Sequence, residues 1–307
     1  MTRSVQVGPG ELGLPATPLV ALPGDSPALH VRARIDQQVR ALLEHEAIAR
    51  QGVDPEGVHQ MRVAVRRMRA ALKAAGDPEL EPLSQELRWL GGILGRIRDI
   101  DVLLGHLRGQ AADLPDDEQA ALERLLRGLV EERRGARRRM LAAFRSARYA
   151  ELLNALVATV NAEPGGHEPA ETRTAGLLDV IARPHRKLVK SARALGDHPL
   201  DDDLHALRIK GKRLRYAAEL AEPAGGKPVR KLIRATKEFQ DILGDHQDTV
   251  VAETEVRRLL ADQPATDAGV AFVAGRLVER ERARRADRRA RWRDALDEVD
   301  RLAKALR

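Results

Sequence analysis

The sequence predicts an all-α protein made of two four-helix bundles that are related by internal duplication and pseudo-two-fold symmetry. Its 307 residues are rich in Ala, Leu, Arg and Glu, with 32% charged and only 2% aromatic residues. Such a composition favours helices over strands. Apolar residues recur at the helical period along most of the chain. Several segments also reappear about 146 residues downstream, which is typical of a duplicated unit.

The first half of the repeat is expected at residues 29–162. It follows a segment rich in Pro and Gly, 1–28, that we expect to be a flexible tail or an irregular wrap. Turns are predicted at Asp-Pro-Glu-Gly, 54–57, and at Gly-Asp-Pro-Glu, 76–79. The helices that we expect in this half cover 29–51, 58–75, 79–109, a long Arg-rich stretch from about 118 to 147, and a shorter apolar stretch from about 152 to 160.

Residues 163–173, EPGGHEPAETR, are predicted to be a linker because they lack helical periodicity. The pattern then starts again in a second half, residues 174–307. Ile35 matches Ile181 at an offset of 146, and Asp99 matches Asp248 at an offset of 149. Offsets that drift so little across successive segments indicate an internal duplication, so we expect the two halves to have equivalent helices.

A basic helix occurs once in each half, as VHQMRVAVRRMRAAL at 58–72 and LHALRIKGKRLRYAA at 204–218. Its basic residues fall within an arc of about 80°, beside an arc of apolar residues. No acidic residue lies between Val58 and Gly76, so the charge is not neutralised within the first helix. We therefore expect two cationic stripes that bind an anion. They contain His59, Arg62, Arg66, Arg69 and Lys73 in the first copy and His205, Arg208, Lys212 and Arg215 in the second.

Both copies resemble the repeated H-x-x-R-x-x-x-[RK]-R-[hydrophobic]-R signature of the CHAD domain, the "conserved histidine α-helical domain". LGRIRDIDVLL and LGDHQDTVVA resemble the Leu-Gly…Asp element that follows it, and the likeness covers residues 29–306. It implies non-enzymatic binding of inorganic polyphosphate along a basic surface around a central cleft, and association with polyphosphate granules. The motif falls on His59, Arg62, Arg66, Arg67 and Arg69, and on His205, Arg208, Lys212, Arg213 and Arg215.

Two departures from the pattern affect the second half. Gly211 lies within the second basic helix and costs about 1 kcal/mol relative to Ala unless close packing compensates. The second Leu-Gly element reads GDHQD where the first reads GRIRD. We therefore do not expect the two halves to bind equally.

Interhelical salt bridges are the structural alternative for these arginines. Their partners would be Asp99, Asp101, Asp241 and Asp248, and Arg67 and Arg213 are candidates for such bridges because they lie about 80° off the stripe. Other bases extend the candidate surface, although those near Glu131 and Glu279 are equally well explained as a solvated face. The extension comprises Arg134, Arg137, Arg186, Lys190, Arg193, Arg230, Arg234, Lys237, Arg282 and Arg285.

Two other functions compete with polyphosphate binding. The net charge of +7 also permits a general polyanion or nucleic-acid binding protein, but the few aromatic residues offer no stacking platform. A metal-dependent phosphohydrolase using His59 and His205 is the least favoured, because neither histidine has a second one at i+4. The closest match to a catalytic E-x-E-x-K strand, 253–257, ends in Arg within a helical stretch. We expect no catalytic residue, metal or cofactor.

The chain has no cysteine and no apolar run near the roughly 20 residues that a membrane span requires. No signal peptide is evident at its start. We therefore expect a cytoplasmic protein without a membrane partner. Its oligomeric state is not predicted.

Overall fold

The computed structural model describes residues 10–21, 25, 27–75, 77–162, 174–263 and 267–306. This part of the chain consists of helices and their connections and contains no β-strand. The all-α prediction is confirmed. The expected linker, 163–173, lies outside the described residues.

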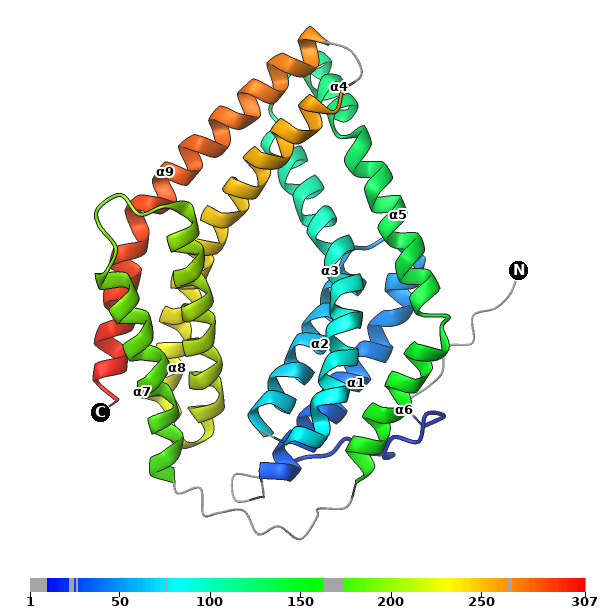
Figure 1. Ribbon diagram of the computed structural model, residues 1–307, viewed down its shortest axis with the longest axis vertical. Coiled ribbons are helices and arrows are strands. Elements are labelled where there is room, and N and C mark those ends of the chain that lie inside the picture. The colour runs from blue at the N-terminus through cyan, green and yellow to red at the C-terminus, as the bar shows by residue number, and fades with distance from the viewer. Residues whose placement is uncertain are drawn as a thin grey trace. The chain divides into compact units, whose positions relative to one another are not determined.

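Nine α-helices and one short 3-10 helix make up the described chain (Figure 1). They are α1 (Pro27–Gln51), α2 (Glu56–Ala75), η1 (Pro78–Leu80), α3 (Glu81–Gln110), α4 (Asp116–Leu125), α5 (Arg127–Ala143), α6 (Ala147–Asn161), α7 (Thr174–Arg193), α8 (Asp201–Ala261) and α9 (Ala268–Lys304).

The described chain forms two compact units that do not coincide with the two halves of the sequence. The first unit comprises Met1–Gly105 and Arg127–Pro169. The second unit comprises His106–Leu126 and Ala170–Arg307. In the first unit α1 packs along α2 and against α6. In the second unit α8 packs along α7 and α9, and α4 packs against α9.

The single Arg-rich helix expected from about 118 to 147 is broken in the structure. α4 ends at Leu125 and α5 begins at Arg127, on either side of the buried Leu126. The boundary between the two units falls at this same point. The break therefore lets α4 and α5 pack into different units. The apolar periodicity of the sequence is continuous across Leu126 and does not indicate this break.

Residues 10–21, part of the expected tail, form an irregular segment that contacts the helices. Leu14 is buried, and the Leu19 amide donates to Asp36 Oδ2 at 2.8 Å. Asn161 Nδ2 donates to the Gly13 carbonyl at 2.8 Å, which ties the segment to the end of α6. These contacts satisfy backbone groups that sequence periodicity cannot assign.

A helical hairpin carries the basic stripe in each unit. In the first unit the hairpin is α2 followed by α3. In the second it is α8, because Gly226 has φ 54° and divides α8 into an N-segment, 201–225, and a C-segment, 227–261. Figure 1 shows the two segments running side by side in opposite directions. Gly226 lies in the sequence PAGGKP, whose Pro and Gly residues interrupt the helix.

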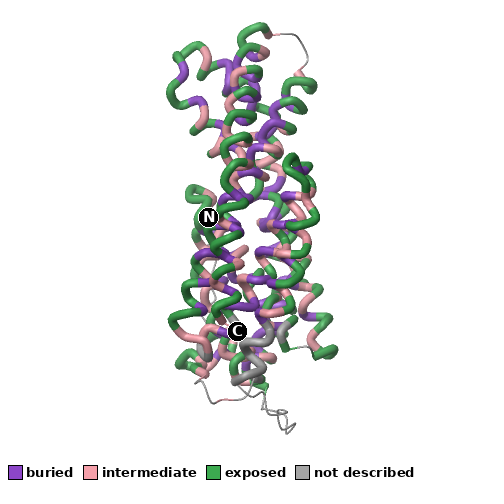
Figure 2. Tube along the Cα trace, turned by 90° about the vertical axis from the view of Figure 1, so that its left-hand side faces the viewer, coloured by how far each residue is buried: buried purple, intermediate pink, exposed green. Residues whose placement is uncertain are grey.

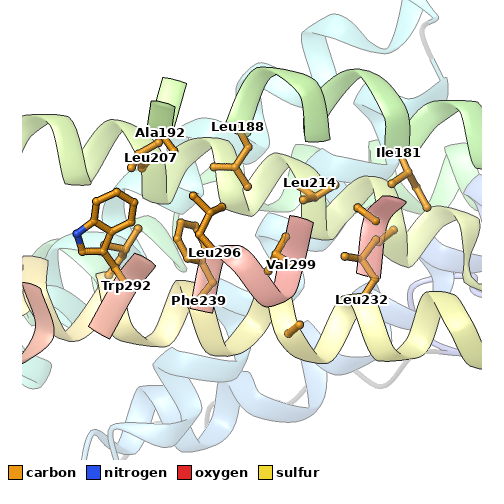
Figure 3. Close-up of a cluster of buried hydrophobic side chains, with 14 of the residues drawn as sticks. Ile181, Leu188, Ala192, Leu207, Leu214, Leu232, Phe239, Trp292, Leu296 and Val299 are labelled. Carbon is orange, nitrogen blue, oxygen red and sulfur yellow. The ribbon is translucent and has the colours of Figure 1, made fainter. Parts of the chain in front are cut away.

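The core of the second unit lies between α7, both segments of α8 and the end of α9 (Figure 3). Trp292 and Phe239 are among its largest fully buried side chains. A Cβ atom on Gly211 would lie 2.9 Å from Phe239 Cε1, so this glycine admits the ring between the segments. The close packing expected to offset the helix cost of Gly211 is therefore present. Figure 2 shows buried positions recurring between exposed ones along the helices, as amphipathic helices require.

Candidate functional site

α2 has the two adjacent faces predicted from its sequence. Its apolar residues are buried, whereas the basic residues beside them are exposed or partly exposed. The buried residues are Val58, Met61, Val65, Met68 and Leu72, and the basic residues are His59, Arg62, Arg66, Arg67, Arg69 and Lys73.

The Leu-Gly…Asp element of α3 forms a seat for Arg62. Arg62 Nη1 donates to the Gly95 carbonyl at 3.2 Å and to Asp99 Oδ1 at 2.8 Å. A Cβ atom on Gly95 would lie 3.0 Å from the same nitrogen, so glycine lets the guanidinium lie directly against the helix and a larger residue would make it shift. Because both charged side chains are substantially exposed, water screens the pair and its main effect is to orient Arg62.

The interhelical bridge hypothesis is therefore confirmed for Arg62, which pairs with Asp99, and wrong for Arg67 in the first unit. Asp99 binds Arg62, and Asp101 binds Arg133 of α5. Arg67 is exposed, and its side chain has no hydrogen bond or ion pair within the described chain. Its position 80° from the stripe directs it away from α3.

Arg98 is a site residue that the motif did not include. Burial and the charge of Arg98 lower the pKa of His59, with smaller contributions from Arg66 and Arg62 and an opposing one from Glu56. The lowered pKa favours the neutral imidazole of His59, which has one N–H to donate to an anion. The spacing Gly95–Arg98–Asp99 on α3 puts these residues on one face and could have identified Arg98 from the sequence.

Several cations of α2 remain without partners in the part of the chain that the structure describes. Arg66, Arg67 and Lys73 are exposed and make no side-chain hydrogen bond or ion pair there. Arg69 is partly exposed, and its buried Nε also lacks a partner. These four residues leave a concentrated positive charge next to the fixed Arg62.

The second unit repeats the seat with a different lining. The Arg208 guanidinium lies across Gly244, where a Cβ atom would be 3.4 Å from both Nε and Nη2. Although part of Asp248 is exposed, loss of hydration at its carboxyl group raises its pKa, and Asp245 adds to this effect. Arg208, His106 and Lys212 oppose the rise. The deprotonated form of Asp248 is thus less favoured than that of an isolated aspartate side chain.

The remaining motif residues of the second unit are partly engaged. His205 Nδ1 lies 2.9 Å from Gln247 Oε1, an oxygen that can only accept, so Nδ1 carries the proton. Arg215 Nε lies 3.1 Å from Glu219. Lys212 is partly exposed, and Arg213 is exposed without a side-chain partner in the described chain.

The two seats differ in charge where GRIRD is replaced by GDHQD. Arg96 matches Asp245, and Arg98 matches Gln247. Arg96 pairs with Glu132, whereas Asp245 lies 3.3 Å from Arg288. Arg98 thus adds a positive charge near His59 in the first unit, and the matching position in the second unit is the neutral Gln247.

The predicted extension separates into engaged and unengaged residues. Arg134 pairs with Glu131, and Arg137 donates to the carbonyls at the end of α1. Arg282 and Arg285 both bind Glu253. Arg137, Arg282 and Arg285 thus connect helices, whereas the pair formed by Arg134 lies within α5 and is exposed. Arg186, Lys190, Arg193, Arg230, Arg234 and Lys237 are exposed, and their side chains have no partner among the described residues.

The acid that the E-x-E-x-K match supplies to the competing enzyme hypothesis, Glu253, connects helices. Glu253, from the match to E-x-E-x-K, lies within α8 and accepts bonds from three arginines, Arg257, Arg282 and Arg285. Within the described ranges no three His, Asp or Glu side chains are grouped to hold a metal ion. No helix there is long and apolar enough to cross a bilayer. The cleft expected between the two basic helices stays a prediction.

Substitution of Gly95 by Ala tests the seat of Arg62. The Cβ atom would make the guanidinium shift from its contacts with the Gly95 carbonyl and Asp99. We therefore expect the affinities for pyrophosphate and polyphosphate, measured by titration calorimetry, to fall about threefold to tenfold. Thermal stability should be unchanged or slightly higher, because Ala favours a helix by about 1 kcal/mol over Gly.

Gly105→Ala is the matched control, since a Cβ atom there meets nothing within 4 Å on the same helix. It should give the helix stabilisation with unchanged affinity. Full affinity in Gly95→Ala would show that anion binding does not depend on the seat.

Comparison with known proteins places the chain in a family. The CHAD domain model matches residues 33–257. Uncharacterized proteins from two strains of Mycobacterium tuberculosis, CDC 1551 / Oshkosh and H37Rv, are each 34% identical over 300 residues, covering 92% of this chain and 54% of the relative. The chain thus spans about half the length of these relatives.

Solved structures show the same fold. The crystal structure of the CHAD domain from the plant Ricinus communis aligns with a TM-score of 0.68 and 29% identity, covering 92% of this chain and 97% of that one. PptA from Streptomyces chartreusis aligns with a TM-score of 0.65 and 20% identity, covering 87% and 98%. The family model covers most of the chain, and the CHAD domain from Ricinus communis has the same fold: this chain belongs to the CHAD domain family.

Proposed function

We propose that this protein binds inorganic polyphosphate without turning it over, and that each helical hairpin provides a binding surface. The observation that carries this proposal is the row of cations on α2 that lacks partners in the described chain, next to an Arg62 fixed by Gly95 and Asp99. A helix that only needed bridges to its neighbours would have acids opposite these cations.

The chemistry of the row suits a chain of phosphates. Arginine presents a planar fork that donates two parallel hydrogen bonds to one phosphate, and lysine adds a compact charge. Successive residues of the stripe are one helical turn apart, about 5.4 Å along the axis. A linear polyanion can therefore contact several of them at once, with the release of counterions and a steep dependence on salt.

The two hairpins are, in this proposal, duplicated elements of a four-helix unit that share a pseudo-two-fold relation. Support comes from the matching residues, since Arg62, Gly95 and Asp99 of the first unit correspond to Arg208, Gly244 and Asp248 of the second. Equivalent seats in both units are what a duplication of a binding element would leave.

The absence of turnover is supported by the surroundings of the acidic side chains. Asp99 pairs with Arg62 and Asp101 with Arg133, and no group of three His, Asp or Glu side chains in the described chain could hold a metal ion. Membership of the CHAD family makes polyphosphate the polyanion of choice. It also leads us to propose a cytoplasmic location on polyphosphate granules.

A competition titration tests the function. Labelled long-chain polyphosphate would be bound at physiological salt and displaced with unlabelled polyphosphate, DNA, RNA or pyrophosphate. We expect polyphosphate to compete at least about 100-fold better than DNA or RNA, because four of the seven aromatic residues are buried and cannot stack on bases. The buried residues are Phe144, Tyr149, Phe239 and Trp292.

Equal competition by nucleic acid would replace the proposal with general polyanion binding. Release of orthophosphate on addition of divalent metal, in an assay run in parallel, would contradict the absence of turnover.

A further inference from the structure

The C-segment of α8 carries a second row of cations outside the family motif. Arg230, Arg234 and Lys237 are exposed, and their side chains have no hydrogen bond or ion pair in the described chain. Spacings of four and three residues continue from this row through Asp241 to Gly244 and Asp248. On a helix such spacings keep residues on one face, so the row lies on the same face as the seat of Arg208.

The register of the hairpin places this row beside the motif stripe. Three contacts fix the register: His205 with Gln247 at 2.9 Å, Arg208 with Gly244, and Gly211 with Gln240, whose Nε2 donates to the glycine carbonyl at 3.2 Å. The numbers of each pair add to nearly the same value, as expected for antiparallel segments that turn at Gly226.

The same register puts Lys237 opposite Arg215 and Arg230 opposite Glu222, near the turn. The motif stripe of the N-segment and the row of the C-segment thus adjoin along the hairpin. Acids interrupt the surface at Glu219, which binds Arg215, and at Asp241. A ligand that uses the whole surface must therefore span several turns of helix.

The first unit has no such row. The positions that match Arg230, Arg234 and Lys237 at an offset of 149 are Glu81, Gln85 and Arg88. Gln85 Nε2 donates to Glu81 Oε1 at 3.4 Å, so these two side chains are engaged with each other. The row is a property of the second unit and does not follow from the duplicated motif.

We propose that Arg230, Arg234 and Lys237 form an extension that binds phosphates beyond those held at Arg208 and Lys212, so that the second unit selects long polyphosphate chains. This inference rests on the proposed polyphosphate function. Gly244 lies 14 positions after Arg230, a rise of about 21 Å along the helix, which is more than a triphosphate can bridge. A short anion gains nothing from the extension, whereas a long chain gains three further cations.

The test compares chain lengths in a variant that neutralises the row. In Arg230→Gln/Arg234→Gln/Lys237→Gln we expect affinity for long-chain polyphosphate, measured by titration calorimetry, to fall about tenfold, and affinity for triphosphate to change less than twofold. The slope of log K against log salt for the long chain should decrease in magnitude by about 2, as expected for three lost contacts.

Arg127→Gln/Arg145→Gln/Arg183→Gln is the matched control, because it removes three exposed cations that lie outside both hairpins and have no side-chain partner in the described chain. It should lower long-chain affinity less than threefold. In a gain-of-function test, Glu81→Arg/Gln85→Arg should raise long-chain affinity of the first hairpin without raising triphosphate affinity.

Equal losses of affinity for triphosphate and for long chains, or an equal loss in the control variant, would overturn the extension. A wild-type protein that binds neither ligand would instead refute the polyphosphate function itself, so the two failures are distinguishable.

Discussion

Charge reversal at Arg66, Arg67 and Arg213 is expected to weaken binding of long-chain polyphosphate at least about 100-fold while the protein stays folded. These arginines are exposed and lack side-chain partners in the described chain, so no bridge is broken. Surface substitutions of this kind usually change stability by no more than about 0.5 kcal/mol each. Affinity would be measured by titration calorimetry and stability by thermal unfolding.

A control with the same change in net charge separates site binding from general attraction. Arg127, Arg145 and Arg183 are also exposed without side-chain partners in the described chain, but lie outside both hairpins. Their replacement by glutamate should lower affinity less than about tenfold. A loss as large as in the stripe variant would mean that net charge alone attracts the ligand. Marked unfolding of the stripe variant would mean that its arginines stabilise the fold.

Arg62 and Arg208 are less suitable for this test, although they begin the motif in each half. Arg62 is held by Gly95 and Asp99, so its reversal would place a carboxylate against Asp99 and disturb the hairpin as well as the ligand. The structure therefore distinguishes two classes of motif arginine. One is anchored between helices and orients the site, and the other faces outward and is available to phosphate.

The sequence could predict the stripes because a helix fixes the direction of every side chain from its spacing. Met61 and Met68 are buried and Arg66 is exposed as the period requires. The choice of partner is not contained in that period. Asp99 binds Arg62 rather than Arg67 because α3 lies on one particular side of α2, a tertiary relation that spacing within α2 does not specify.

The same limit explains the errors in the fold. Residues 118–147 have one continuous helical pattern, yet Leu126 separates helices that pack into different units. The pattern records that a residue is apolar and not which core receives it. Residues 10–21 lack any period and still pack, through Leu14 and through backbone hydrogen bonds to α1 and α6. Such contacts depend on the surface formed by the helices.

The second large effect is expected in the core of the second unit, where Trp292→Ala should lower the free energy of unfolding by about 3–5 kcal/mol. The indole is almost fully buried among residues of α7, α8 and α9, so its removal loses apolar burial and leaves a cavity (Figure 3). Urea unfolding followed by far-UV circular dichroism measures this change without relying on tryptophan fluorescence.

Phe272→Ala is the control that isolates burial, because Phe272 lies on the same helix but is 59% exposed. Its loss should cost no more than about 0.5 kcal/mol. Both aromatics occur in an apolar-periodic stretch of the sequence, so periodicity alone assigns them similar roles. A cost for Phe272→Ala equal to that for Trp292→Ala would show that Phe272 is covered in the native protein. A cost below about 1 kcal/mol for Trp292→Ala would mean that the second unit is not held together by this core.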